Sequence, residues 1–103
     1  MKMRSRTLVL LRRSSNPPTL SEDELEALQR GHLAFLVSMR EAGHMSEAGP
    51  FSEQEDQGLR GLCLYATPIE QTRELVRGDP MVKAGWLRAE VFTWWTPDPG
   101  PGT

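Results

Sequence analysis

The order in which strand and helix patterns alternate along this chain most restricts the fold that it can adopt. Turn-forming residues separate six periodic segments, which read as strand, helix, strand, strand, helix and strand. The strands are expected over 6–12, 44–51, 59–66 and 86–95, and the helices are expected to begin at Glu22 and at Pro68. This order is typical of a ferredoxin-like α+β fold, in which two helices lie on one face of a four-stranded antiparallel sheet.

The first helix has the clearest local signal. Ser21 and Glu24 have the spacing of a capping box, and Leu20 and Leu25 occupy the two positions of a hydrophobic staple. Gly43 is expected to end the helix in a left-handed conformation. Apolar residues and one histidine recur every three or four positions on a single helix face, at Leu25, Leu28, His32, Phe35 and Met39.

The second helix is expected to be short. Thr67 is suited to the N-cap, Pro68 to the first helical position and Glu70 to the last position of a capping box. Gly78 is expected to end this helix. The segment 79–85 that follows reads as a turn, because it begins with the turn-forming pair Asp-Pro.

Both faces of the expected strands are apolar, although the helices can cover only one of them. In the first strand Leu8 and Leu10 point to one face, while Val9 and Leu11 point to the other. Because no residues are left over for another layer, we expect a second copy to pack on the open sheet face, which makes the protein a homodimer. A monomer with scattered apolar surface residues is the alternative.

The composition fits one small domain. The chain has 103 residues, of which 38% are apolar and 25% are charged, and its net charge is −2. We expect a single domain over 1–96 and a disordered tail of alternating Pro and Gly over 97–103. Trp94 and Trp95 are adjacent in the last strand and must point to opposite faces, so one is expected to pack inside the subunit and the other to lie toward the partner or the barrel rim.

Secretion, membrane insertion and nucleic-acid binding are not expected. The apolar run over 8–11 is too short for a signal peptide or a membrane span, and Arg12 and Arg13 follow it at once. Cys63 is the only cysteine, which excludes an internal disulfide and favours a reducing compartment. The basic N-terminal segment has no aromatic platform beside it, so we expect a cytoplasmic protein that does not bind nucleic acid.

His32 and Asp79 are the candidates for acid-base chemistry. His32 interrupts an apolar stripe, where an imidazole is more often satisfied structurally than catalytic. Asp79, between Gly78 and Pro80, is also suited to start a turn. If Asp79 reaches His32, its carboxylate would orient the imidazole as a general base. Gly31 costs about 1 kcal/mol relative to alanine inside a helix, which indicates close approach by a backbone or a ligand at this point.

Five short motifs follow one another along most of the chain. They are Leu8-Val9-Leu10-Leu11, His32-Leu33 in the first helix, Gly43 before Glu47-Ala48-Gly49-Pro50-Phe51, Arg60-Gly61-Leu62, and Asp79-Pro80-Met81-Val82-Lys83-Ala84-Gly85. In this order and spacing they resemble the YCII-related (YciI-like) family, over residues 7–95. The resemblance implies a ferredoxin-like fold that pairs into a dimeric α/β barrel, with an active-site cleft that holds a His–Asp pair. By motif position that pair is His32 and Asp79.

The resemblance also implies a chemistry. One branch of the family is similar to enzymes that eliminate chloride from chlorinated hydroxyquinols, for which a His–Asp pair would be a proton-abstracting base with its orienting carboxylate. Ser46, Gly49 and Pro50 match the second-strand motif and would line the same cleft as substrate-binding residues. A strand ended by a Gly-Pro turn explains these three residues as well.

Two hypotheses about function remain open. The leading one is a small enzyme without a cofactor, in which His32, oriented by Asp79, performs lyase, dehydratase or isomerase chemistry on an unknown small organic molecule. No metal is expected, because His32 and His44 lack a cysteine or a clustered carboxylate at metal-ligand spacing. The competing hypothesis is a non-catalytic module of the same fold that binds a ligand or a protein partner.

Overall fold

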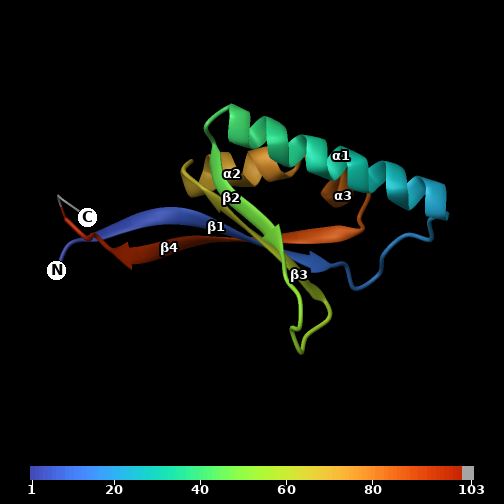
Figure 1. Cartoon of the computed structure of the whole chain (residues 1–103), viewed down its shortest axis with the longest axis horizontal. Coiled ribbons are helices and arrows are strands. Elements are labelled where there is room, and N and C mark those ends of the chain that lie inside the picture. The colour runs from blue at the N-terminus through green and yellow to red at the C-terminus, as the bar shows by residue number, and fades with distance from the viewer. Residues whose placement is uncertain (101–103) are drawn as a thin grey trace.

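The computed structural model describes residues 1–100, which form four strands and three helices (Figure 1). In chain order these are β1 (Met3–Arg13), α1 (Glu22–Glu41), β2 (Met45–Pro50), β3 (Leu59–Tyr65), α2 (Ile69–Val76), α3 (Pro80–Lys83) and β4 (Leu87–Pro97). The strands lie side by side in the order β2-β3-β1-β4, and every neighbouring pair is antiparallel. The predicted ferredoxin-like α+β fold is therefore confirmed.

Helix α1 begins and ends at the predicted residues. The Ser21 hydroxyl accepts a hydrogen bond from the Glu24 amide at 3.1 Å, and the Glu24 carboxylate accepts one from the Ser21 amide at 3.2 Å. Both partners of the capping box are thus present, and they satisfy amides that an uncapped helix would leave without partners. Gly43 follows the helix with a φ of 78°, the left-handed conformation expected of it.

Helix α2 begins one residue later than predicted, because Thr67 has another partner. Pro68, rather than Thr67, is the N-cap residue of α2, and it makes no side-chain capping bond. The Thr67 hydroxyl instead lies 2.7 Å from the hydroxyl of Thr72, which is fully buried. A buried hydroxyl needs hydrogen-bond partners, and this requirement outweighs the capping pattern read from the local sequence.

The segment expected to be a turn contains the short helix α3. The Asp79 side chain accepts a hydrogen bond from the Met81 amide at 2.9 Å, and Asp79 is the N-cap residue of the helix. Pro80 follows as the first helical residue, where its missing amide hydrogen is not needed. Gly85, with a φ of 78°, then leads into β4. The turn reading of 79–85 is corrected to one helical turn.

Strands β1 and β4 are longer than predicted, and their paired ends project beyond the helices (Figure 1). Pro97, placed in the tail by the sequence, is the last residue of β4, and the Asp98 amide bonds to the Lys2 carbonyl at 2.9 Å. The ladder therefore continues past the expected domain end at residue 96. The last three residues of the expected tail, 101–103, lie outside the described residues.

The projecting ends also correct the prediction for the two tryptophans. Trp95 is 59% exposed and Trp94 is 40% exposed, so neither packs inside the subunit. Trp95 lies across from Ser5 near the end of the ribbon, beyond the reach of the helices. Trp94 lies across from Arg6, whose guanidinium is 5.1 Å from the centre of its indole ring.

The helices lie over one face of the sheet (Figure 1), and the buried core residues come from this face and from the helices above it. These buried residues are Val9, Leu11, Met45, Cys63, Tyr65, Val76, Met81 and Leu87. On the other face Leu8 lies across from Phe92, which is 45% exposed, so an apolar surface is left without a helix above it. Within the described residues, no helix is long and apolar enough to cross a membrane.

Candidate active site

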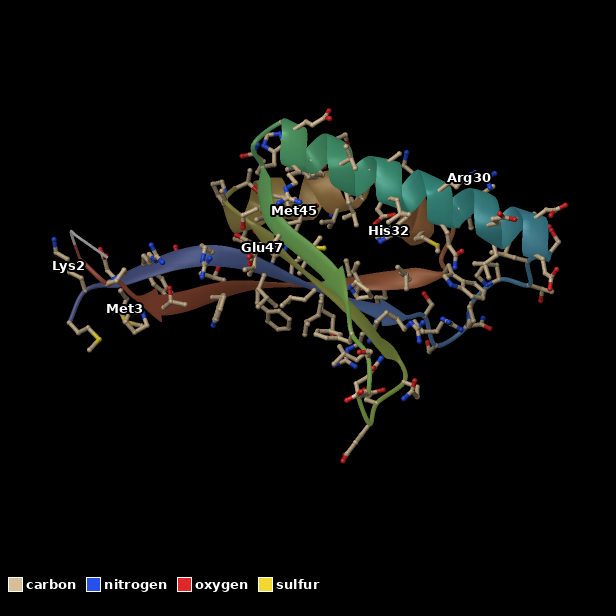
Figure 2. The ribbon with its side chains drawn as sticks, in the orientation of Figure 1. Lys2, Met3, Arg30, His32, Met45 and Glu47 are labelled. Carbon is tan, nitrogen blue, oxygen red and sulfur yellow. The ribbon has the colours of Figure 1, made fainter. Side chains whose placement is uncertain are left out.

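The structure brings His32 and Asp79 into direct contact. His32 lies in the middle of α1 and points toward the sheet (Figure 2), while Asp79 caps α3. The His32 Nδ1 atom is 2.6 Å from the Asp79 Oδ2 atom. The Asp79 side chain is 3% exposed and the His32 side chain is 18% exposed. The contact that the sequence could only suggest is therefore present, on two elements that are 47 residues apart.

The hydrogen bonds of Asp79 define the orientation of the imidazole. Its Oδ1 atom accepts from the Met81 amide, and its Oδ2 atom faces His32. An ionised carboxylate at Asp79 can only accept hydrogen bonds, which would place the shared hydrogen on Nδ1 of His32. In a neutral imidazole the other nitrogen, Nε2, then carries a lone pair and can accept a proton.

Gly31 sets the distance between α1 and α3. A Cβ atom added to Gly31 would lie 3.1 Å from the Cγ atom and 3.3 Å from the Cβ atom of Pro80, which is tighter than ordinary packing. Pro80 directly follows Asp79, so this close approach brings the carboxylate within reach of His32. The glycine expected to allow a close approach does so, and the approaching group is a proline ring.

A cavity of about 350 Å³ lies beside His32, between α1 and the sheet. This volume is in the range of small-molecule sites. Gly49 and Pro50 of β2 line it, whereas Ser46 does not. The Ser46 hydroxyl is exposed and lies 3.5 Å from the Leu64 carbonyl oxygen. Of the five predicted site residues, His32, Gly49 and Pro50 therefore line the cavity, Asp79 contacts His32 without lining it, and Ser46 lies apart.

Gly61 is a site residue that the sequence reasoning did not single out. A Cβ atom at this position would lie 2.9 Å from the Gly49 carbonyl oxygen, so only glycine lets β2 approach β3 this closely. Both glycines line the cavity. A glycine inside an expected strand was the available signal, because such a residue often marks close approach by another backbone.

Three larger side chains at the cavity were also missed: Arg13, Arg60 and Trp86. The Arg13 guanidinium lies 4.5 Å from the centre of the Trp86 ring. Arg13 and Trp86 lie on β1 and directly before β4, and no local pattern predicts that they face the same cavity as a residue in α1. Their assembly depends on the tertiary fold alone.

The cysteine at the base of the cavity is suited to packing and not to nucleophilic attack. Cys63 lines the cavity and is 3% exposed. Burial, followed by the charge of Asp79, raises the pKa of its thiol to about 12. Burial likewise raises the pKa of the neighbouring Tyr65 hydroxyl. Both groups are therefore protonated and uncharged at neutral pH.

A second, larger hollow lies elsewhere, against β4 and α2. Its volume is about 610 Å³, and its charged residues are Arg73, Arg77 and Arg88. Arg73 and Arg77 form ion pairs along α2 with Glu70 and Glu74. No histidine or carboxylate lines this hollow within residues 1–100, so it lacks an acid-base pair despite its greater size. Nor do three or more His, Cys, Asp or Glu side chains of that range gather as a metal site requires.

Comparison with known proteins gives a match at the level of structure. No protein-family model and no curated protein matches the sequence. One similar solved structure is 5-chloro-2-hydroxyhydroquinone dehydrochlorinase (TftG) from Burkholderia phenoliruptrix AC1100, in complex with 2,5-dihydroxybenzoquinone. The match has a TM-score of 0.53 and 23% identity, and it covers 84% of this chain and 92% of that chain. The chain is thus similar in fold to a dehydrochlorinase, an enzyme that removes chloride from a small ring compound.

Proposed function

We propose that this chain is a YciI-like enzyme that transfers protons to and from a small organic molecule, with His32 as the general base. One observation carries the proposal: His32 contacts a buried carboxylate through Nδ1 and lines a cavity of ligand size. This arrangement matches a base held in one orientation by a second group. A histidine with a purely structural role would not need an adjacent cavity.

A lyase reaction follows directly from this geometry. The Nε2 atom of His32 accepts a proton from an acidic C–H bond of the bound molecule, and the electron pair of that bond forms a new double bond. The leaving group departs from the neighbouring carbon with its own bonding pair. Asp79 stabilises the imidazolium that forms, and His32 then returns the proton to water or to the leaving group. An isomerase would return it to another carbon.

The structural neighbour supplies the first compound to test. It is named for the removal of chloride from 5-chloro-2-hydroxyhydroquinone. We propose the same reaction class for this chain, with chlorinated and unchlorinated hydroxylated rings as the test set. The fold alone does not select a substrate, because one fold hosts many chemistries.

The test measures chloride release and C–H exchange by NMR in D2O over that set of ring compounds. The wild-type protein is expected to accelerate at least one of the two reactions. His32→Gln should lower the rate by about a hundredfold or more, the usual contribution of a general base, and Asp79→Asn should lower it in the same direction. His44→Gln is the matched control, since His44 follows α1 and does not line the cavity.

Two results would contradict the proposal. Rates that are the same in the wild-type protein and in His32→Gln would remove His32 from the reaction. A protein that binds these compounds and accelerates neither reaction would favour the non-catalytic binding module.

We also propose that the protein is a homodimer. The sheet face opposite the helices exposes Phe92 and Trp94, which are 45% and 40% exposed. On the same face Leu8 of β1 is only partly buried and lies across from Phe92, so the apolar surface spans two strands there, whereas Leu10 lies across from Glu90. A contiguous apolar patch of this kind is typical of an interface. We propose that the partner is a second copy of this chain and that the open sheet faces of the two copies pack against each other.

A further inference from the structure

We infer that the cavity beside His32 selects a small ring compound that carries a negative charge, and that Arg13 and Arg60 recognise that charge. The inference rests on the proposed function in one respect, because it takes this cavity as the substrate site. It goes further by naming the charge and shape of the substrate and the residues that would bind its charged group.

Among residues 1–100, the charged residues that line the cavity are basic, and none is acidic. Arg13 and Arg60 line the same cavity as His32, and none of its lining residues is an aspartate or a glutamate within the described part of the chain. The ion pairs of the described arginines do not involve Arg13 or Arg60; their arginines are Arg12, Arg30, Arg73 and Arg77. Arg13 and Arg60 are exposed residues that line the cavity, and neither forms an ion pair with a carboxylate among residues 1–100. An anion is the ligand that complements them.

The second step is that both arginines are held in place before a ligand arrives. The Arg13 guanidinium stacks on Trp86, with 4.5 Å between its central carbon and the ring centre. One Nη atom of Arg60 donates a hydrogen bond to the Gln57 carbonyl at 3.2 Å. A stacked guanidinium still has N–H groups along its edge, and these fit the two oxygens of a carboxylate or the oxygen of an ionised phenol.

The apolar part of the cavity supplies the third step. Leu25, Leu36, Met81 and Trp86 line it, so the body of the ligand must be apolar. A volume of about 350 Å³ suits one substituted six-membered ring. The ligand class is therefore a ring with an acidic oxygen, either a carboxylate or an ionised phenol. The same two arginines would stabilise the negative charge that develops when His32 removes a proton.

Binding of matched probes tests the inference without requiring turnover. Benzoate and its neutral analogue benzamide are titrated into the protein, with the backbone amide signals of Gly49 and Gly61 as the NMR readout. Benzoate should bind at least about tenfold more tightly, since its charge-assisted hydrogen bonds are stronger than those of the neutral amide. 4-Nitrophenol, titrated below and above its own pKa, distinguishes the phenolate from the carboxylate arm.

Arginine variants locate the recognition. Arg13→Gln and Arg60→Gln should each weaken benzoate binding by about tenfold and leave benzamide binding unchanged. Arg13→Lys should restore part of the affinity, because it keeps the charge but loses the planar fork. The matched control is Arg30→Gln on α1, which removes one charge from a side chain that is 68% exposed, is paired with Glu26 and points away from the sheet (Figure 2).

The outcomes separate this inference from the proposed function. Equal binding of benzoate and benzamide, no binding of either anionic probe, or no loss beyond that of Arg30→Gln would overturn the charge recognition. Arginine-dependent binding of anions with no proton transfer in any compound would support the recognition and overturn the catalytic proposal. If the protein transfers protons only on neutral compounds, at a rate that is unchanged in both arginine variants, the catalytic proposal is supported and the charge recognition is overturned.

Discussion

Asp79 has two partners for one carboxylate, and this double role explains why the site is ordered. One oxygen caps the single turn of α3 and the other contacts His32. The carboxylate is nearly inaccessible to water, so both oxygens need hydrogen-bond donors, and the fold supplies one for each. Asparagine at this position has one oxygen, which would keep the cap to the Met81 amide, so it would present an N–H group to the histidine.

Cys63 and Tyr65 lie close enough to this carboxylate for its charge to influence them. Their buried, uncharged forms predict how stability depends on pH. The Cys63 pKa rises from an ordinary value of 9.0 to about 12 on folding, so the folded state retains a proton that the unfolded state loses between these values. The protonated thiol's contribution to the free energy of unfolding is complete below about pH 9 and is lost as pH rises toward about 12.

We therefore expect the free energy of unfolding to fall above about pH 9, by about 1 kcal/mol per pH unit for the thiol. Urea unfolding at about pH 8 and about pH 10.5 measures the loss. Cys63→Ala should show a smaller difference between the two pH values, although its stability at each is lower because of the cavity it creates. Equal differences in the two proteins would show that the thiol makes no such contribution.

At the scale of elements, the site depends on how closely α1 crosses α3. Gly31 permits this approach to Pro80. Gly31→Ala should change the free energy of unfolding little, because a gain of about 1 kcal/mol in helix propensity is offset by the crowded proline ring. The proton-transfer rate should nevertheless fall, since α3 must move and Asp79 moves with it.

A double-mutant cycle distinguishes positioning from general damage. In the Asp79→Asn background, Gly31→Ala should lower the rate no further, because the contact it disturbs is already impaired. Full additivity of the two losses would show that Gly31 acts by another route.

The three helices differ in how well their positions could be predicted from the sequence. The capping box of α1 was predictable because its donors and acceptors lie within four residues. The start of α2 was not, because it depends on the burial of Thr72, which only the folded chain decides. Helix α3 was missed for a different reason: four residues are too few for a periodic pattern.

The candidate site, too, could be predicted only in part from the sequence. The sequence drew attention to His32 and to Asp79 separately, and the family resemblance paired them, but residue spacing could not give their distance. Arg13 and Trp86 carried no local signal at all, since a cavity wall is built from side chains of distant elements. The chemistry of single residues can be assessed from the sequence. Which side chains of distant elements meet at one site cannot be predicted from it.

At the scale of the whole molecule, the sheet has one covered and one open face, and the open face makes the proposed homodimer testable. Phe92→Glu should convert the dimer to a monomer in sedimentation or light scattering at micromolar concentration, because Phe92 lies across from Leu8 and burying an unpaired carboxylate at an interface is strongly unfavourable. Val37→Glu is the matched control: Val37 is 55% exposed on α1, away from the sheet face. A monomeric wild-type protein, or equal effects of both variants, would contradict the proposed interface.

We propose that Asp79 holds His32 with Nδ1 protonated and Nε2 free toward the cavity. Long-range ¹H–¹⁵N NMR correlations of the two histidine rings, recorded where both imidazoles are neutral, test it directly, with His44 as the internal reference. The account predicts the Nδ1–H tautomer for His32 in the wild-type protein and loss of that preference in Asp79→Asn, with His44 unchanged. An Nε2–H tautomer at His32 in the wild-type protein, or the same tautomer in both proteins, would contradict it.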